Sequence, residues 1–265
     1  MIYRWLLAIF LLLMFFVPLF LLVVQSFARE WRFQMIFPET FTLQHWQSAL
    51  SDPLVVEALP VTVLLTFGTV LLNFIIAFPA ARVLAFYDFY GKAVVETMLL
   101  VPVLVPALAI AVGLHSAFLS IGLANSWLGV LLVYLLPTVP FTIRILKNGF
   151  IRIGSDLEAQ AAVLGASRWQ RFLDIIMPLM LPSVRAAAFL AGVIALSQYA
   201  LTVTVGGGQV MALSAVYFPF AESANASIMA ALSLLFSLLP LGLLLVFEGM
   251  FRLLFLNRVK AIRKG

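Results

Sequence analysis

The sequence predicts an all-α integral membrane protein with six transmembrane helices and both termini in the cytoplasm. Of its 265 residues, 64% are hydrophobic and only 10% are charged, a balance far outside that of soluble globular domains. Six apolar stretches reach the ~20 residues that a helix needs to cross the hydrocarbon core of a bilayer. Because lipid cannot satisfy backbone hydrogen bonds, these stretches are expected to be helices rather than strands.

The predicted spans belong to one transmembrane domain that comprises residues 1–265. In order, they cover residues 4–27, 57–81, 93–115, 124–143, 184–205 and 226–250. For the first span a cleavable signal peptide is the alternative, because Ser26, Phe27 and Ala28 form a small-x-small pattern. The apolar run is longer than the ~7–15 residues of a signal core, which favours a retained helix. Pro102 and Pro106 predict a kink in the third span.

Lysine and arginine are distributed unequally between the two sides that these six spans create. With the N-terminus inside, fourteen of them fall on the inner side, and only Arg29 and Arg32 fall outside. The positive-inside rule therefore places both termini in the cytoplasm. The net charge of +5 needs no nucleic-acid partner, because outside the short C-terminal tail no basic run is interleaved with aromatic residues.

Several kinds of site find no support in the sequence. The chain has no cysteine, and His45 and His115 are too far apart to suggest a metal site. An intramembrane enzyme would need clustered His, Asp or Glu, and an ion-coupled secondary carrier, the alternative transport function, would need an ionisable group near mid-span. The sequence offers neither. It also lacks the G-x-x-x-x-G-K-[ST] phosphate loop, so ATP chemistry would have to come from another chain.

The longest inner loop, residues 144–183, carries a polar insert between two apolar spans. Ser155 precedes Glu158 by three residues, which is the spacing of a capping box at a helix start. Apolar residues then follow at i, i+4 and i+7, and Gly165 is predicted to end this helix in the left-handed region.

A second short helix is predicted immediately after Gly165. Ser167 and Gln170 have capping-box spacing, and Trp169 and Phe172 belong to an apolar stripe opposite a charged face. Pro178 is expected to stop this helix. Such an amphipathic pair fits a surface-lying membrane element and a docking element for a soluble partner equally well.

One string within the insert is shared with a known family. It reads Glu158-Ala159-Gln160-Ala161-Ala162-x-Leu164-Gly165-Ala166-Ser167, followed by Trp169-Gln170-x-Phe172, Ile175 and Met177-Pro178. This string resembles the EAA loop of the membrane subunits of bacterial binding-protein-dependent ABC importers of type I. That family usually places its glutamate six residues before the glycine, a position that Ala159 holds here, whereas Glu158 stands seven before it. With the six spans and the loop position, the resemblance covers most of the chain.

The resemblance implies the type I ABC importer permease fold in a bacterial inner membrane. The insert would then dock on a cytoplasmic ATPase through Glu158, Ala159, Gly165, Ala166, Trp169 and Phe172. The implied partners are a second permease subunit, homologous or identical, two ATPases that bind ATP and Mg, and an external solute-binding protein. No cofactor is expected on this chain. The similarity is to the branch that serves polyamines, thiamine, ferric iron, sulfate and phosphonates.

Polar residues inside the predicted spans are candidates for the solute path, because polar groups at membrane depth face a cavity or another helix. Gln198 and Tyr199 lie near the middle of the fifth span, with Thr202 one turn further, and Asn73 lies in the second span. Hydrogen bonding between helices is the alternative role, especially for isolated Ser and Thr.

Overall fold

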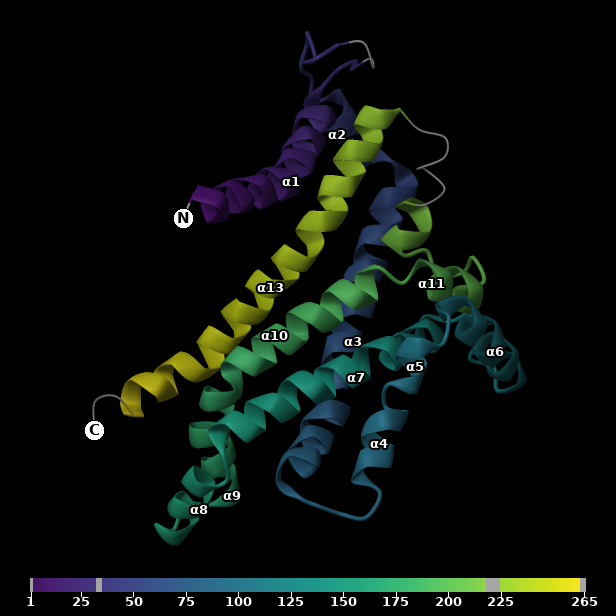
Figure 1. Cartoon of the computed structure of the whole chain (residues 1–265). Helices are drawn as coiled ribbons and strands as arrows, with labels where there is room; N and C mark the ends of the chain where they lie inside the picture. The colour runs from purple at the N-terminus through teal and green to yellow at the C-terminus, as the bar shows by residue number, and fades with distance from the viewer. Residues whose placement is uncertain (1, 32–34, 218–224, 263–265) are drawn as a thin grey trace.

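The computed structural model describes residues 2–31, 35–217 and 225–262. Within them the secondary-structure elements are all helices, joined by loops, and one isolated bridge pairs Ala28 with Phe41. The predicted all-α class is therefore confirmed (Figure 1). In chain order the elements are α1 (Ile2–Phe27), α2 (Gln44–Ser51), α3 (Pro53–Phe86), α4 (Lys92–Met98), α5 (Val101–Leu104), α6 (Ala107–Ser120), α7 (Trp127–Ile153), α8 (Asp156–Val163), α9 (Arg168–Gln170), the π-helical segment η1 (Arg171–Ile176), α10 (Met177–Leu196), α11 (Tyr199–Gly206) and α13 (Ala226–Ile262).

The centre of the bundle is the pair α3 and α7, which make the most extensive helix–helix contact of the described residues. Both helices begin at a capped residue. The Asp52 carboxylate accepts the Leu54 N–H at 2.8 Å, and the Ser126 hydroxyl accepts the Gly129 N–H at 3.1 Å. These caps satisfy amides that the first turn of a helix leaves without a partner.

Two further helices pack on this pair. α10 lies against both α7 and α3, and α13 lies against α10 (Figure 1). Phe67 of α3 and Phe247 of α13 stack with their ring centroids 5.5 Å apart. An ion pair joins Arg185 of α10 to Glu248 of α13. These four helices form the body of the bundle, and of the candidate path residues Asn73 lies on α3 whereas Tyr199 and Thr202 lie on α11.

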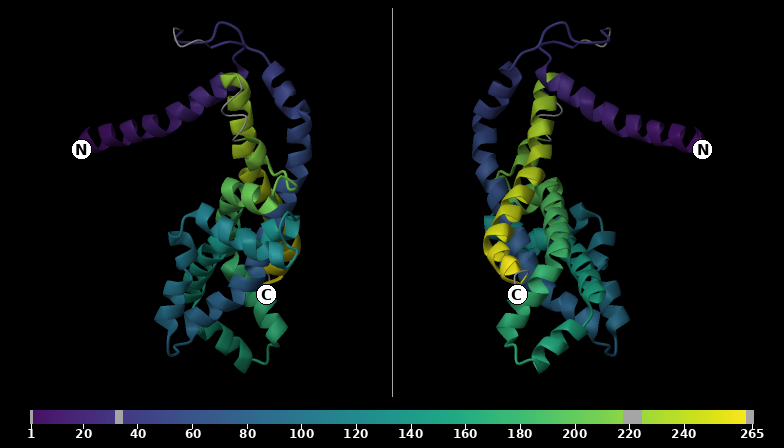
Figure 2. Two further views of the ribbon diagram at one scale, coloured as in Figure 1. Left: turned by 90° about the vertical axis from the view of Figure 1, so that its right-hand side faces the viewer. Right: turned by 90° about the vertical axis from the view of Figure 1, so that its left-hand side faces the viewer.

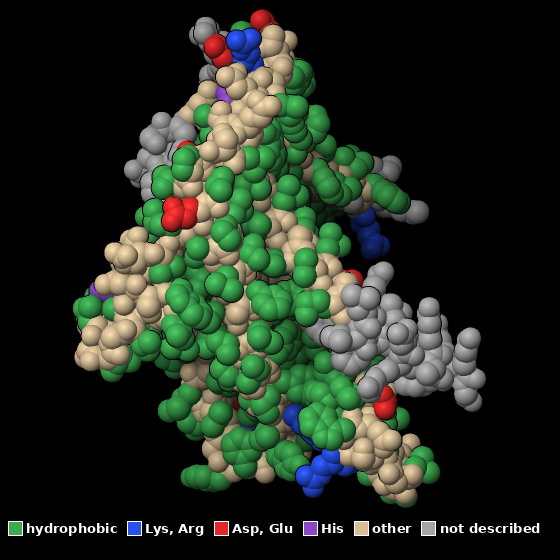
Figure 3. All heavy atoms as spheres, turned by 180° about the vertical axis from the view of Figure 1, so that it is seen from behind, with side chains coloured by type: hydrophobic (Ala, Val, Ile, Leu, Met, Phe, Trp, Pro, Cys, Tyr) green, Lys and Arg blue, Asp and Glu red, His purple; other side chains and the backbone are tan. Residues whose placement is uncertain are grey.

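α1 differs from the other long helices, because it projects away from the bundle as a separate arm (Figure 2). Its membrane-length apolar window has no buried residue, although α1 contacts α13 and α2 near its C-terminal end. Hydrophobic side chains cover most of the face seen in Figure 3 as well. A surface this apolar is stable only in lipid or against another protein.

Five described helices are long and apolar enough to cross a membrane, and the number is six if one bent pair counts as a single crossing. The bent pair is the predicted third span, 93–115. Its halves, Lys92–Leu104 and Ala107–Ser120, meet at 97°. Pro106 lies at the break and the preceding Val105 is extended, as expected for a residue before proline. The predicted proline kink is thus a sharp break.

Two other segments depart from the predicted spans. α7 continues ten residues beyond the predicted end at 143, because apolarity marks where the membrane ends and not where the helix ends. The predicted fifth span, 184–205, is interrupted, since Gln198 leaves the helical region between α10 and α11. Arg32 and the basic residues beyond position 250, which belong to the predicted charge asymmetry, lie outside the described side chains.

Candidate functional site

The polar insert folds as a helical elbow at one end of the molecule, where α8 and α9 meet (Figure 1). We call residues 155–176 the elbow segment. Gly165 ends α8 with φ +85°. Its N–H donates to the Ala162 carbonyl at 3.1 Å, and the Ala166 N–H donates to the Ala161 carbonyl at 3.0 Å. These two bonds form a Schellman motif, so the predicted left-handed glycine terminus is confirmed.

The start of α9 also agrees with prediction. The Ser167 hydroxyl accepts the Gln170 N–H at 3.3 Å, and the Gln170 side-chain oxygen accepts the Ser167 N–H at 2.8 Å. This reciprocal pair is the predicted capping box. It begins a new helix two residues after Gly165 and so fixes the sharp angle of the elbow.

The prediction of a capping box between Ser155 and Glu158 is wrong. Ser155 is itself helical and makes no side-chain cap bond to the first turn of α8. The Glu158 carboxylate instead accepts two bonds from Arg82 of α3, both at 2.7 Å. Arg171 of η1 lies 3.7 Å from the same carboxylate. An arginine attracts a carboxylate more strongly than a backbone amide does, so Glu158 ties the elbow segment to α3.

Several apolar side chains of the elbow segment are exposed. Val163 is 89% exposed, Leu164 86% and Trp169 73%, and Ala159 is exposed while Ala166 is half-buried. The side chain of Phe172 contacts α3, where its ring centroid lies 5.6 Å from that of Phe78 in an edge-on arrangement. Of the two predicted aromatic anchors, Trp169 is thus the exposed one and Phe172 is half-buried.

Pro178 does not stop the second helix, contrary to prediction. Residues 168–196 form one continuous helical stretch, in which Pro178 occupies the first turn of α10. The turn before it is a π-helix, where the Met177 N–H donates to the Phe172 carbonyl five residues back. Pro178 has no N–H to donate, and the π-helical turn directly before it accommodates this interruption of the hydrogen-bond ladder without ending the helix. The elbow segment thus runs directly into a membrane helix.

A second polar feature is buried inside the bundle. It is a stripe along α3, spaced at i, i+4, i+7 and i+11, that consists of Thr62, Thr66, Thr69 and Asn73. Each side chain donates to the carbonyl four residues back at 2.7–2.8 Å. The whole stripe is at most 4% exposed. We call these four residues the polar stripe.

The polar stripe also bonds to neighbouring helices. The Asn73 amide donates to the Thr138 hydroxyl of α7 at 2.8 Å, and the Thr62 hydroxyl accepts the Leu213 N–H at 2.7 Å. Thr202 of α11 is also buried and shares a 2.5 Å hydrogen bond with the Tyr134 hydroxyl of α7. Asn73 and Thr202 therefore join helices within this chain, which is the alternative that the sequence left open for such residues.

Gln198 and Tyr199 occupy the break between α10 and α11. Both are half-buried, and the Gln198 amide donates to the Ile194 carbonyl of its own helix at 3.0 Å. They are more accessible than Asn73 and Thr202. Among the four predicted path residues, these two are the partly exposed ones.

The network that holds the elbow segment was missed by sequence reasoning. Arg82 is one of the basic residues on the predicted inner side, and Arg171 lies on the charged face of the predicted second helix. Nothing in the sequence pairs Arg82 with a residue 76 positions later. The polar stripe was recognisable, because its spacing puts all four side chains on one helix face. No group of three potential metal-ligating side chains occurs in the described ranges.

Comparison with known proteins finds a matching family and several relatives. The family model described as "Binding-protein-dependent transport system inner membrane component" matches residues 73–254. A molybdate/tungstate transport system permease protein of Thermococcus kodakarensis is 35% identical over 149 residues, which cover 56% of this chain and 60% of that protein. A sulfate transport system permease protein of Escherichia coli is 25% identical over 211 residues, covering 75% and 72%.

The fold has solved counterparts. A chain of a bacterial ABC transporter involved in the import of the polysaccharide alginate superimposes with a TM-score of 0.69 at 17% identity, over 94% of this chain and 95% of that one. The family match includes the polar residue Asn73, all of α7, the elbow segment and most of α13. The chain belongs to the binding-protein-dependent transport system inner membrane component family.

Proposed function

We propose that this chain is the transmembrane permease subunit of an ATP-driven importer whose elbow segment docks on a cytoplasmic ATPase. The observation that carries the proposal is the exposure of Val163, Leu164 and Trp169 around the Gly165 turn. These side chains lie at the end of the molecule that the charge distribution assigns to the cytoplasm. Large apolar groups exposed together on the aqueous side favour a protein partner.

The contacts of the elbow segment supply a mechanism for coupling. Glu158 joins it to α3 through Arg82, and η1 continues without interruption into α10. A displacement of α8 and α9 by a closing ATPase would therefore act on two membrane helices at once. We propose that this rigid-body movement opens the permease alternately to each side of the membrane.

The proposed assembly contains a second permease subunit, two ATPases carrying ATP and Mg, and an external solute-binding protein. Both termini of this chain would be cytoplasmic. Relatives named for molybdate/tungstate and sulfate transport support an inorganic oxyanion as the solute. We propose Gln198 and Tyr199 as the residues of the path, since an amide and a phenol can both donate hydrogen bonds to such an anion.

Docking is tested by Gly165→Asp in the complex co-expressed with its ATPase. A Cβ added at Gly165 would meet no atom within 4 Å other than those of its chain neighbours, so membrane insertion and folding should be preserved. The φ of +85° disfavours a side chain at this turn, and the carboxylate would fill the space of the partner. We expect co-purification of the ATPase to fall at least tenfold and uptake to be lost.

The matched control is Gly91→Asp. Gly91 has the same φ of +85° and equally open surroundings, but lies in the loop between α3 and α4. Co-purification should survive in this variant. Normal docking and uptake in Gly165→Asp, or equal losses in both variants, would contradict the assignment and leave the elbow segment as a surface-lying helix pair.

A further inference from the structure

A cavity of about 510 Å³ lies between α4 and α7, away from the elbow segment. On α7 it is lined by one helix face that includes Arg144, Lys147 and Asn148, and on α4 by Glu96 and Thr97. Apolar side chains complete the wall. A pocket with two basic residues and one acid in its lining carries a net charge of +1, which favours an anionic ligand.

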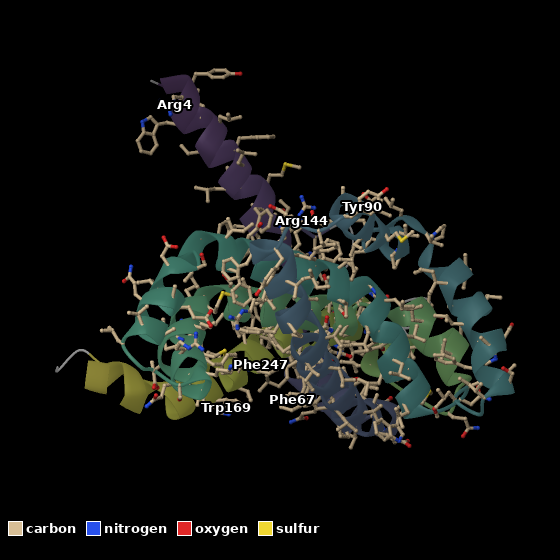
Figure 4. The ribbon with its side chains drawn as sticks, turned by 90° about the horizontal axis from the view of Figure 1, so that it is seen from below. Arg4, Phe67, Tyr90, Arg144, Trp169 and Phe247 are labelled. Carbon is tan, nitrogen blue, oxygen red and sulfur yellow. The ribbon has the colours of Figure 1, made fainter. Side chains whose placement is uncertain are left out.

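The charged groups of the cavity are not equivalent. The Lys147 ammonium is paired with the Glu96 carboxylate at 2.5 Å. Arg144 has no ion pair or side-chain hydrogen bond with any residue in the described part of the chain. Its guanidinium, labelled in Figure 4 in a view from the end that holds the elbow segment, is exposed. Arg144 is thus the available cation, with five N–H donors for an anion.

The depth of Arg144 points to the membrane surface. Trp127, at the opposite end of α7, is an exposed tryptophan of the kind found at bilayer interfaces. Seventeen residues separate it from Arg144, which is roughly 25 Å along a helix. Because the hydrocarbon core is ~30 Å thick, Arg144 would lie near its other border, at the level of the lipid phosphates.

A second cavity adjoins the first. Its volume is about 430 Å³ and it shares Leu99 and Pro140 with the charged cavity. Its lining is wholly hydrophobic and reaches toward the middle of α7 at Leu135 and Leu136. A charged cavity next to an apolar one matches the two parts of a lipid, with a site for the headgroup beside a site for an acyl chain.

We propose that the α4–α7 cavities bind one anionic phospholipid, with its phosphate on Arg144 and an acyl chain in the apolar cavity. Basic pockets between transmembrane helices at the inner leaflet bind anionic headgroups in this way. The inference requires only that α7 spans the membrane, and it does not depend on the transport role. A result that contradicted ATPase docking would therefore not affect the proposed lipid site.

The test is native mass spectrometry of the purified full-length chain, loaded from vesicles of phosphatidylglycerol or of phosphatidylcholine. Wild-type protein should retain phosphatidylglycerol preferentially. Arg144→Gln should lower the retention of phosphatidylglycerol about tenfold, because the loss of one hydrogen bond to a charged group weakens binding by about that factor. Arg144→Lys should keep most of it. Glu96→Gln should raise retention, because it frees Lys147 for the phosphate.

Arg152→Gln is the control, because it removes an exposed arginine of α7 that does not line the cavity. Helical circular dichroism and gel filtration verify the fold of each variant. Equal retention of the two lipids, or unchanged retention in Arg144→Gln, would overturn the proposal. So would Arg144-dependent binding of free phosphate or sulfate without lipid, because the site would then serve a soluble oxyanion.

Discussion

The elbow segment and the polar stripe are both polar interruptions of an apolar chain, yet their surroundings are opposite. The polar stripe is buried, and each of its four side chains donates a hydrogen bond within the chain. The elbow segment also satisfies its turn amides internally, but it leaves Val163, Leu164 and Trp169 exposed. The stripe therefore serves the packing of this chain, whereas the elbow segment presents an apolar surface that the described part of this chain does not cover.

The comparison shows that residue polarity alone does not locate a functional surface in a membrane protein. Asn73 and Thr202 were candidates for the solute path because they are polar at membrane depth, and both bond to neighbouring helices instead. Trp169 is apolar and is the exposed group at the proposed interface. The proposed docking surface is recognised by the exposure of its apolar side chains.

The largest loss of stability is expected from the polar stripe. Asn73→Ala removes the bond to Thr138 and leaves space between α3 and α7, so the free energy of unfolding should fall by about 1–2 kcal/mol. Detergent-denaturation curves measure this loss. Ser116→Ala is the control, because that exposed hydroxyl bonds only to Val112 of its own helix. If Asn73→Ala were as stable as the wild type but had altered solute uptake, Asn73 would be assigned to the solute path and not to the packing of α3 against α7.

An intermediate effect is expected where the elbow segment meets α3. Arg82 and Glu158 are both partly exposed, so the pair should contribute at most about 1 kcal/mol. A double-mutant cycle of Arg82→Gln and Glu158→Gln measures that coupling energy, with Arg152→Gln as the exposed control. If the pair transmits movement, either variant lowers solute uptake per ATP hydrolysed while the ATPase stays bound. Unchanged uptake per ATP would reduce the pair to a surface contact.

The smallest change in stability is expected at the break between α10 and α11. Gln198→Leu removes a bond within one helix only, and its free energy of unfolding should stay within about 0.5 kcal/mol. Ser197→Ala is a matched control, because Ser197 and Gln198 donate to the same Ile194 carbonyl, at 2.9 and 3.0 Å. Uptake kinetics should change in Gln198→Leu and not in Ser197→Ala. Equal uptake in both would assign Gln198 to packing.

Local chemistry explains which features of the elbow segment could be predicted. A left-handed glycine and a capping box each depend on residues within a few positions, so Gly165, Ser167 and Gln170 behave as their spacing predicts. Glu158 has the same local spacing to Ser155, but Arg82 competes for its carboxylate from another helix. Local rules fail where a distant charge offers a stronger partner.

The sequence by itself determined the helical class, the membrane location of the apolar runs and the elbow at Gly165, because hydrophobicity, helical periodicity and capping are local properties. Tertiary structure decided what each polar residue contacts. It pairs Arg82 with Glu158, buries Asn73 against Thr138, and turns Phe172 onto Phe78. Among the residues that the structure describes, it also leaves Arg144 without an ion-pair or side-chain hydrogen-bond partner. Such contacts join residues far apart in the chain, and only the packing of helices fixes which of them meet.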